Sequence, residues 1–464
     1  MTGGPEQLLG RTESVCPECL KVVPALRVAG AGQVYLVKEC DDHGVFRTLI
    51  WEGEEHYRRW DMARLPVRVD HPVTPVDKGC PYDCGPCPEH RQDPCCVLLE
   101  VTGNCNLNCP ICFASAAAGK SQDPSLEEIR DWYRRLHSHG SHYNIQLSGG
   151  EPTVRDDLPE IVRLGKEFGF PHLQLNTNGL RLAREPELAR KLKDAGLDTV
   201  YLQFDGTRDD IYQATRGRAL LEEKLAAIEH CAAAGLGVAL VPTLVAGVNL
   251  DHIGEIIDFA LSRMPYVRGV HFQPISYFGR YPGVPPVHRL TIPRILREIE
   301  AQTAGRMRQE HFAPVGAENP YCTFHGSFTL QPDGTLKPWR VQGCCGPSQE
   351  PVDPKAGVAK SRTFVARQWS APPQAACCNR DPAAGLDELL RRIHTYSISI
   401  SGMAFQDAWN LDLERLRDCK LFIFSPPGKL IPFCAFNLTA PDGRSLYRPR
   451  RGEDRHGPAP QQLG

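Results

Sequence analysis

The chain has 464 residues, with 53 Lys or Arg against 55 Asp or Glu, and its formal net charge is −2 at pH 7. This balance excludes a bulk electrostatic attraction to nucleic acid or to an anionic membrane, and the length predicts about three domains. No apolar run reaches the ~18 residues of a membrane span, and the start MTGGPEQLLG lacks the apolar core of a signal peptide. We therefore expect a cytoplasmic protein without a transmembrane segment.

The N-terminal region, residues 11–60, pairs cysteines with short β-like runs. CPEC supplies Cys16 and Cys19, and CDDHG supplies Cys40 and His43. Knuckles of the C-x2-C and C-x2-H form predict a closed, four-ligand mononuclear site, with structural zinc favoured over iron. A Cys-rich connector occupies residues 76–96.

The spacing C-x3-C-x2-C occurs twice, in CPYDCGPC (80–87) and CNLNCPIC (105–112). In a reducing cytosol, clustered cysteines more often bind metal than form disulfides. We call Cys80, Cys84 and Cys87 the connector triplet, and Cys105, Cys109 and Cys112 the barrel triplet. Three thiolates at this spacing suit a [4Fe–4S] cluster, whose fourth iron needs another ligand.

The two triplets differ in the distance to the next cysteine along the chain. Cys95 lies within reach of the connector triplet and could close an auxiliary [4Fe–4S] cluster there, with a zinc site as the alternative. After the barrel triplet the next cysteine is Cys231, so one iron of that cluster would stay open, as the reactive position of a catalytic metal site does.

From residue 97 the sequence alternates short apolar runs with amphipathic segments. The candidate strands are 97–101, 143–147, 172–176, 199–204, 237–245 and 267–273. Six such units imply parallel strands with right-handed helical crossovers. They predict an α/β fold, a partial (β/α)6 barrel over 97–276, with the barrel triplet at its C-terminal mouth, where active sites lie.

Beyond the barrel, residues 277–440 predict an irregular, Cys-rich cap and residues 441–464 a disordered tail. In CKLFIFSPPGKLIPFC, Cys419 and Cys434 would face each other across a hairpin. They would be two ligands of one cluster or a disulfide, of which the cluster is favoured in a cytosolic chain. Cys322 and either Cys344 or Cys345 are the candidate partners.

The segment LSGGEPT (147–153) comes directly after the second predicted strand. Its glycines leave the backbone uncovered, so a ligand with amino and carboxylate groups could approach while chelating the open iron. We therefore expect Gly149 and Gly150 to border the ligand site, and Glu151 starts the loop that follows.

The pair CNLNCPIC and GGEP resembles the radical S-adenosylmethionine (SAM) enzymes over residues 97–276. The resemblance implies that the open iron binds SAM and that cluster reduction cleaves it to a 5′-deoxyadenosyl radical, which takes hydrogen from an unactivated C–H bond. It places Gly149, Gly150 and Glu151 on the methionyl part of SAM. Strand-end groups would face SAM or substrate, with simple packing at the barrel rim as the alternative for each: Asn176, Asn178, Gln203, Asp205 and Gln273. Ile111 departs from the aromatic residue common before the last cysteine, which implies a small change in adenine packing.

The CPECLK…CDDHG, CPYDCGPCPEH and PPGKLIPFCAFN segments resemble one multi-cluster subfamily, which contains tetraether lipid synthases and dihydropterin dimethyltransferases. This resemblance implies methylation or C–C bond formation on a lipid or pterin-like substrate, one or two auxiliary clusters, and reduced ferredoxin or flavodoxin as electron donor. It also keeps rubredoxin-like iron open for the N-terminal site.

Two other functions fit the same cysteines. A peptide-modifying or maturation enzyme could carry a Cys-rich cap of this kind. A non-catalytic iron–sulfur electron-transfer scaffold could carry the triplets, but such a scaffold has no need of the SAM pocket that GGEP indicates.

Overall fold

The computed structural model describes residues 6–448 except 63–67, 70–71, 73, 120–121, 141–142, 282, 284–288, 317, 341–352, 373–385 and 427. The candidate ligand Cys344 and its neighbour Cys345 therefore lie outside the described residues, as does most of the expected tail. None of the helices in the described ranges is long and apolar enough to cross a membrane.

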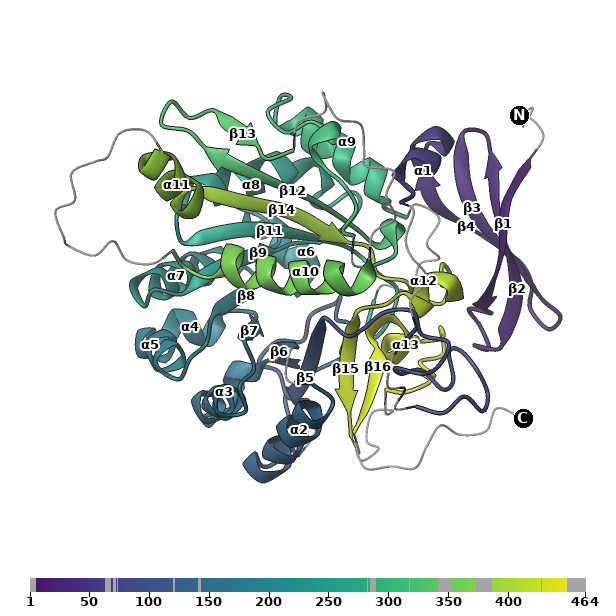
Figure 1. Ribbon diagram of the computed structural model, residues 1–464, viewed down its shortest axis with the longest axis horizontal. Coiled ribbons are helices and arrows are strands. Elements are labelled where there is room, and N and C mark those ends of the chain that lie inside the picture. Colours follow the sequence, from purple (N-terminus) through teal and green to yellow (C-terminus); the bar gives the residue numbers. More distant parts are fainter. Residues whose placement is uncertain are drawn as a thin grey trace.

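The N-terminal region forms an antiparallel sheet of its own, ordered β1-β2-β3-β4, with α1 after it in the chain (Figure 1). The bounds are β1 (Gln7–Val15), β2 (Val22–Gly30), β3 (Gln33–Cys40), β4 (Gly44–Glu52) and α1 (Glu54–Trp60). The turns β1–β2 and β3–β4 carry the two knuckles, so both cysteine motifs meet at one end of this sheet.

The six predicted parallel strands all occur, as neighbours in a 12-stranded sheet ordered β13-β12-β14-β11-β9-β8-β7-β6-β5-β15-β16, with β10 beside β11. They are β5 (Cys96–Thr102), β6 (Asn144–Gly149), β7 (His172–Thr177), β8 (Thr199–Gln203), β9 (Gly237–Val241) with β10 (Thr243–Leu244), and β11 (Val267–Pro274). The run predicted at 237–245 divides at Pro242, which has no N–H to donate to the ladder. The α/β barrel-type fold is thus confirmed.

Helices cover the outer face of these strands (Figure 1). They are α2 (Leu126–Ser138), α3 (Leu158–Glu167), α4 (Leu180–Arg184), α5 (Pro186–Asp194), α6 (Asp209–Arg216), α7 (Leu221–Ala233), α8 (Ile253–Ser262) and α9 (Ile292–Gln302). Helix α2 begins with a capping box, in which Ser125 and Glu128 each accept a backbone N–H of the other.

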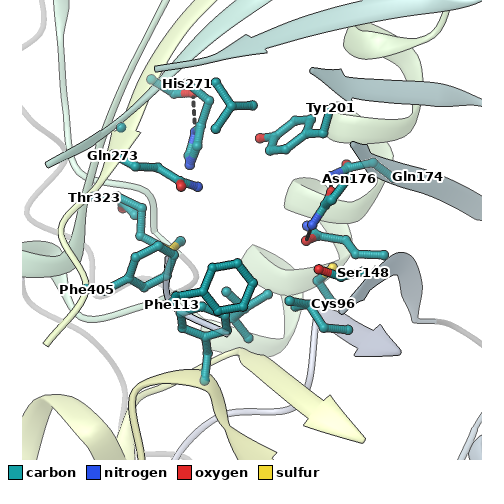
Figure 2. A pocket seen from close by; sticks show the side chains of 18 of the residues that line it. Cys96, Phe113, Ser148, Gln174, Asn176, Tyr201, His271, Gln273, Thr323 and Phe405 are labelled. Carbon is teal, nitrogen blue, oxygen red and sulfur yellow. Dashed lines mark hydrogen bonds between the residues drawn. The ribbon is translucent and has the colours of Figure 1, made fainter. Parts of the chain in front are cut away.

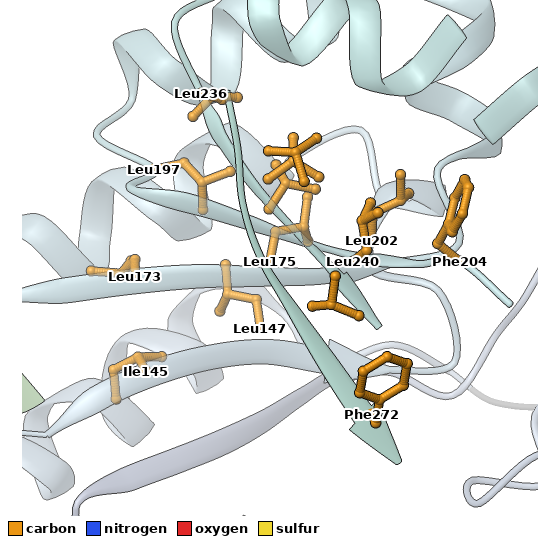
Figure 3. Close-up of a cluster of buried hydrophobic side chains, with 14 of the residues drawn as sticks. Ile145, Leu147, Leu173, Leu175, Leu197, Leu202, Phe204, Leu236, Leu240 and Phe272 are labelled. Atoms are coloured by element: carbon orange, nitrogen blue, oxygen red, sulfur yellow. The ribbon is translucent and has the colours of Figure 1, made fainter. Parts of the chain in front are cut away.

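The strands alternate between two environments. Ile145 and Leu147 of β6, like Leu173 and Leu175 of β7, are fully buried in the core beneath the helices (Figure 3). Their neighbours in sequence carry amides and hydroxyls, and these line a cavity on the opposite face of the sheet (Figure 2). A period of two therefore separates the apolar core from a polar inner wall.

Residues 277–440 contain more regular structure than expected, because they complete both edges of the barrel sheet. β14 (Ser397–Met403) pairs in parallel with β11 and antiparallel with β12 (Thr323–Leu330), which pairs with β13 (Leu336–Pro338); β15 (Leu421–Ser425) pairs in parallel with β5 and antiparallel with β16 (Lys429–Pro432). The sequence of β14, SISISGM, alternates small polar and apolar residues, so it gives a weak apolar signal. The remaining elements are α10 (Pro354–Trp369), α11 (Leu386–Thr395), α12 (Leu413–Arg417), α13 (Phe433–Asn437) and four 3-10 turns at Pro152–Val154, Leu250–His252, Gln309–His311 and Pro320–Cys322.

The first residues of the predicted tail are packed against the rest of the chain. The hydroxyl of Tyr447 donates to Pro81 O at 2.7 Å and accepts from Cys84 N at 3.0 Å, and Arg448 pairs with Glu100 at 2.8 Å. Residues 441–448 therefore belong to the folded structure and brace the connector triplet.

Candidate active site

A cavity of about 620 Å³ lies inside the curved sheet (Figure 2). Helix α10 packs against β9, β11 and β14 and contributes Phe364, Val365 and Trp369 to the wall. Amides of the inner strand faces are hydrogen-bonded in series: Gln174 Nε2 donates to Asn176 Oδ1 at 2.9 Å, and Asn176 Nδ2 donates to Gln146 Oε1 at 3.1 Å. A fixed row of polar groups thus faces aromatic side chains that include Phe113 and Phe405.

The barrel triplet lies in the loop after β5, and all three of its cysteines line this cavity. Arg280 holds the loop: its Nε donates to Cys109 O at 2.5 Å, and its backbone exchanges two hydrogen bonds with Cys112 at 2.8 and 2.9 Å. Burial raises the pKa of Cys105 to about 12 and also raises that of Cys109. Thiolates in this place need a bound cation, so the donor set fits an iron–sulfur cluster.

The two glycines of GGEP allow the end of β6 to cross the barrel-triplet loop. A Cβ on Gly149, whose φ is 127°, would lie 2.1 Å from Thr102 O, and one on Gly150 would lie 2.1 Å from Asn104 O. Gly150 N and Glu151 N donate to these same two carbonyls at 2.9 and 2.8 Å. The glycines are required by this backbone crossing, and they also line the cavity.

The Glu151 side chain is 1% exposed and ties β6 to β7. Its Oε1 accepts from Thr153 Oγ1 at 2.6 Å and Thr177 Oγ1 at 2.7 Å, and its Oε2 accepts from Asn178 N at 2.6 Å. Asn178 in turn donates to Asn106 Oδ1 at 2.7 Å, inside the barrel-triplet loop. The carboxylate therefore fixes the strand ends, while the residue remains at the cavity wall.

Asp205 is fully buried and pairs with Arg216, a residue that the sequence analysis missed. Arg216 Nε lies 2.6 Å from Asp205 Oδ2, and its Nη1 donates to Ile111 O at 3.3 Å between the last two barrel-triplet cysteines. Burial alone would raise the pKa of Asp205, but the guanidinium lowers it overall. Gln203, the other predicted residue here, donates to Asp205 Oδ2 at 2.6 Å.

Lys224, on α7, is a second charged group that the sequence analysis missed. It is fully buried, donates to Asn178 O at 2.5 Å and Gln203 Oε1 at 3.2 Å, and burial lowers its pKa to about 8. One signal was available: Lys224 stands with Ala227, Ile228 and Cys231 on the buried stripe of an amphipathic helix. A lysine on such a stripe is rarely buried without a polar partner.

In the connector triplet, Cys80 Sγ lies 3.7 Å from Cys84 Sγ. The Cys80 thiol and burial raise the pKa of Cys84, and Cys87 and Cys419 lie close enough to add to that rise. Around Cys95, in contrast, the charged neighbours are Lys420, Arg362 and Glu318. Cys419 thus lies near the connector triplet, whereas Cys95 lines the cavity.

Three further thiols gather beside α12 and α13. Cys434 and Cys322 both act on the pKa of Cys419, which burial raises. Arg415 Nη2 donates to Cys322 Sγ at 3.4 Å, and Gln406 N donates to Cys434 Sγ at 3.3 Å. N–H donors aimed at sulfur are the hydrogen bonds that tune iron–sulfur ligands.

The N-terminal knuckles bring Cys16, Cys19, Cys40 and His43 together, with their ligand atoms all within 4.8 Å of one another. His43 Nδ1 lies 3.6 Å from Cys16 Sγ and 3.5 Å from Cys40 Sγ, and the hydrogen bond with His43 lowers the pKa of Cys40 to about 7. Three thiols and one imidazole in this space fit a tetrahedral metal ion.

Comparisons with known proteins agree with this arrangement. Residues 99–260 match the family model of the radical SAM superfamily, and residues 8–52 match that of the HMPTM N-terminal zinc ribbon domain. The chain therefore belongs to the radical SAM superfamily of enzymes.

Two relatives and one solved structure illustrate the range of similarity. The chain is 35% identical over 472 residues to the 7,8-dihydro-6-hydroxymethylpterin dimethyltransferase of Methanocaldococcus jannaschii, covering 92% of this chain and 93% of that protein. It is 34% identical over 171 residues to a probable GTP 3′,8-cyclase of Methanothermobacter marburgensis, covering 37% of this chain and 55% of the cyclase. The structure of Streptococcus suis SuiB bound to S-adenosylmethionine aligns with 17% identity and a TM-score of 0.38, over 46% of this chain and 47% of SuiB.

Proposed function

We propose that this enzyme methylates a carbon atom of a reduced pterin or a closely related heterocycle, which forms a new C–C bond. The observation that carries the proposal is the cavity itself, in which three thiols of one loop open onto a row of fixed amides opposite aromatic rings. The similarity along the whole chain to a dihydropterin dimethyltransferase supports the same substrate class.

A lipid substrate, the other possibility that the sequence leaves open, fits this wall less well. An alkyl chain would cover the amides of Gln146, Gln174 and Asn176 without offering any hydrogen bond, and burying such groups unpaired costs free energy. A planar heterocycle has apolar faces for Phe113 and Phe405 and a polar edge for the amides.

In this proposal the barrel triplet would hold a [4Fe–4S] cluster that leaves one iron for SAM. Bound there, the two groups would supply the radical chemistry that can remove hydrogen from an unactivated C–H bond. Gly149 and Gly150 line the cavity beside the barrel triplet, and the methionyl group would lie against them. Arg216 and Arg280 hold the loop in register, and Asn178 links the loop to the end of β7.

The other cysteines would serve structure and electron transfer. We assign zinc, with iron as the alternative, to the knuckle of Cys16, Cys19, Cys40 and His43. The connector triplet would hold an auxiliary [4Fe–4S] cluster, for which both Cys95 and Cys419 are candidate fourth ligands. Cys322 and Cys434 would bind a further cluster if Cys344 joins them. Reduced ferredoxin or flavodoxin would deliver the electron.

Anaerobic turnover tests the proposal. The iron-reconstituted enzyme is incubated with dithionite, 7,8-dihydro-6-hydroxymethylpterin and SAM labelled in its methyl group, and 5′-deoxyadenosine and pterin products are measured by mass spectrometry. We expect 5′-deoxyadenosine and a pterin heavier by one methyl group, and the label reports whether SAM donates that carbon. Cys105→Ser should abolish both products, whereas Cys231→Ser, in the helix core, should not. Full iron loading without 5′-deoxyadenosine would refute the assignment.

A further inference from the structure

A buried ion pair in the cavity wall has no role in the chemistry derived so far. Glu318 is 4% exposed and lines the cavity, as do Lys420 and Thr323. Glu318 Oε1 accepts from Thr323 Oγ1 at 2.6 Å and lies 3.3 Å from Lys420 Nζ. Thr323 begins β12 and Lys420 precedes β15, so the pair joins segments from the two edges of the sheet.

Among the residues that the structure describes, one oxygen of this carboxylate has partners, and it is Oε1. Among the described residues, no donor forms a hydrogen bond with Glu318 Oε2, although the side chain is almost completely removed from bulk water. A buried carboxylate that is purely structural normally satisfies both oxygens. The second oxygen is therefore free to accept a hydrogen bond from a ligand in the cavity.

The pair brings a carboxyl group and an amino group together in the cavity wall, with Glu318 Oε1 and Lys420 Nζ 3.3 Å apart. Burial lowers the pKa values of His271 and His325, which also line the cavity, to about 4, so both imidazoles are neutral at pH 7. The cavity thus presents an acceptor oxygen of Glu318 directly beside the amino group of Lys420, with two neutral imidazoles in the same wall.

We propose that Glu318 and Lys420 form the specificity anchor of the substrate and bind the aminopyrimidinone edge of the heterocycle. This inference rests on the proposed function and deepens it. That edge carries an amino group and a ring N–H, both donors, beside a carbonyl oxygen. The donors match the Glu318 carboxylate and the carbonyl oxygen matches Lys420, whereas an alkyl chain offers neither. Charge-assisted hydrogen bonds of this kind are the strong ones.

Equilibrium binding tests the anchor without any turnover. Binding of 7,8-dihydro-6-hydroxymethylpterin to the metal-loaded enzyme is measured anaerobically for the wild type, Glu318→Gln and Glu298→Gln. Glu298 is the matched control, because it pairs with Arg294 on α9 and does not line the cavity. We expect Glu318→Gln to weaken binding about 10- to 100-fold, the effect of losing a charge-assisted hydrogen bond, and Glu298→Gln to leave it unchanged.

A second ligand shows whether the contact is direct. The analogue of the same pterin that lacks the 2-amino group should bind the wild type about 10-fold or more weakly than the parent pterin, since it loses one donor to Glu318. Glu318→Gln should discriminate much less between the two. Discrimination that survives in Glu318→Gln would overturn the proposal, because a merely structural carboxylate leaves the ligand contacts in place.

The variant leaves Lys420 buried and unpaired, so its thermal unfolding is measured in parallel. If Glu318→Gln does not fold, the double variant Glu318→Gln/Lys420→Met removes both charges and takes its place. We expect this double variant to have lost tight pterin binding, and wild-type affinity in it would overturn the anchor. A wild type that binds the pterin but never cleaves SAM refutes the proposed function and leaves the anchor standing.

Discussion

Arg216 and Asp205 form a fully buried ion pair, with Nε and Oδ2 2.6 Å apart, and the same guanidinium reaches the backbone of Ile111 in the barrel-triplet loop. The end of β8 is thereby connected to the loop that carries Cys109 and Cys112. The pair acts through the loop, so Arg216 is a positioning residue in the proposed reaction.

Replacing Arg216 by Met should leave the Asp205 carboxylate buried without its charged partner. Leaving one partner of a buried pair uncompensated costs about 3–5 kcal/mol, so we expect a lower unfolding midpoint together with reduced iron–sulfur absorbance after reconstitution. Arg208→Gln is the control, because Arg208 pairs with Asp210 at the exposed surface and should cost no more than about 1 kcal/mol. Equal stability of the two variants would contradict the role given to the pair.

Gly150→Ala should separate the end of β6 from the barrel-triplet loop. The added methyl carbon would lie 2.1 Å from the backbone oxygen Asn104 O. Neither atom can rotate away, because one belongs to the backbone and the other is bonded to it, so the end of β6 and the loop must move apart. We expect the free energy of unfolding to fall by about 2 kcal/mol or more, measured by urea unfolding. We also expect incomplete cluster loading, measured by iron content. Gly283→Ala provides the matched control, since its Cβ would meet nothing within 4 Å. Full cluster loading in Gly150→Ala would speak against this account.

The fourth ligand of the connector cluster can be decided by comparing two serine variants. Cys419 contributes to the raised pKa of Cys84, whereas the neighbours that act on Cys95 are Lys420, Arg362 and Glu318. We therefore expect Cys419→Ser to alter the electron paramagnetic resonance signal of the auxiliary cluster and Cys95→Ser to preserve it. A signal that changes in Cys95→Ser and not in Cys419→Ser would identify Cys95 as the fourth ligand, as its proximity in sequence favours.

Lys224 should give the stability a recognisable pH dependence. Its pKa is lowered to about 8 in the folded protein, against about 10.4 in an unfolded chain, so between these values the unfolded chain binds more protons. The free energy of unfolding should therefore rise with pH across that window, by up to about 3 kcal/mol from this group. Lys224→Met should remove this contribution. Urea unfolding of both proteins at pH 7.5 and 10 measures it, and parallel pH profiles would count against it.

Metal removal from the N-terminal knuckle should loosen a distant part of the cavity wall. Ser14 Oγ and Lys38 Nζ, both on strands that lead into the knuckle, donate to Leu411 O and Ala408 O at 2.6 Å each. Phe405, which lines the cavity, lies just before this segment. We expect Cys16→Ser/Cys19→Ser to lose the metal and to speed hydrogen exchange at residues 406–412. Unchanged exchange in metal-free protein would show that the two parts are not connected.

The sequence predicts those features that depend on residues close together in the chain. The six parallel strands are predictable from alternating apolar runs, and the two triplets from spacing alone. β14 was missed because SISISGM has few apolar residues, although its pairing with β11 gives it a buried place. Glu318 and Lys420 could not be paired from the sequence, because their proximity exists only after the two edges of the sheet are built.

The bracing of the connector triplet by Tyr447 has a consequence for biosynthesis. Cys84 leaves the ribosome early. Tyr447, whose hydroxyl accepts the backbone N–H of Cys84, is translated more than 300 residues later, and so is Cys419. A cluster inserted into the nascent chain would therefore sit in an unfinished cradle exposed to solvent and oxygen. Loading of this centre should consequently be a post-translational event, completed by a maturation system that acts on the released polypeptide.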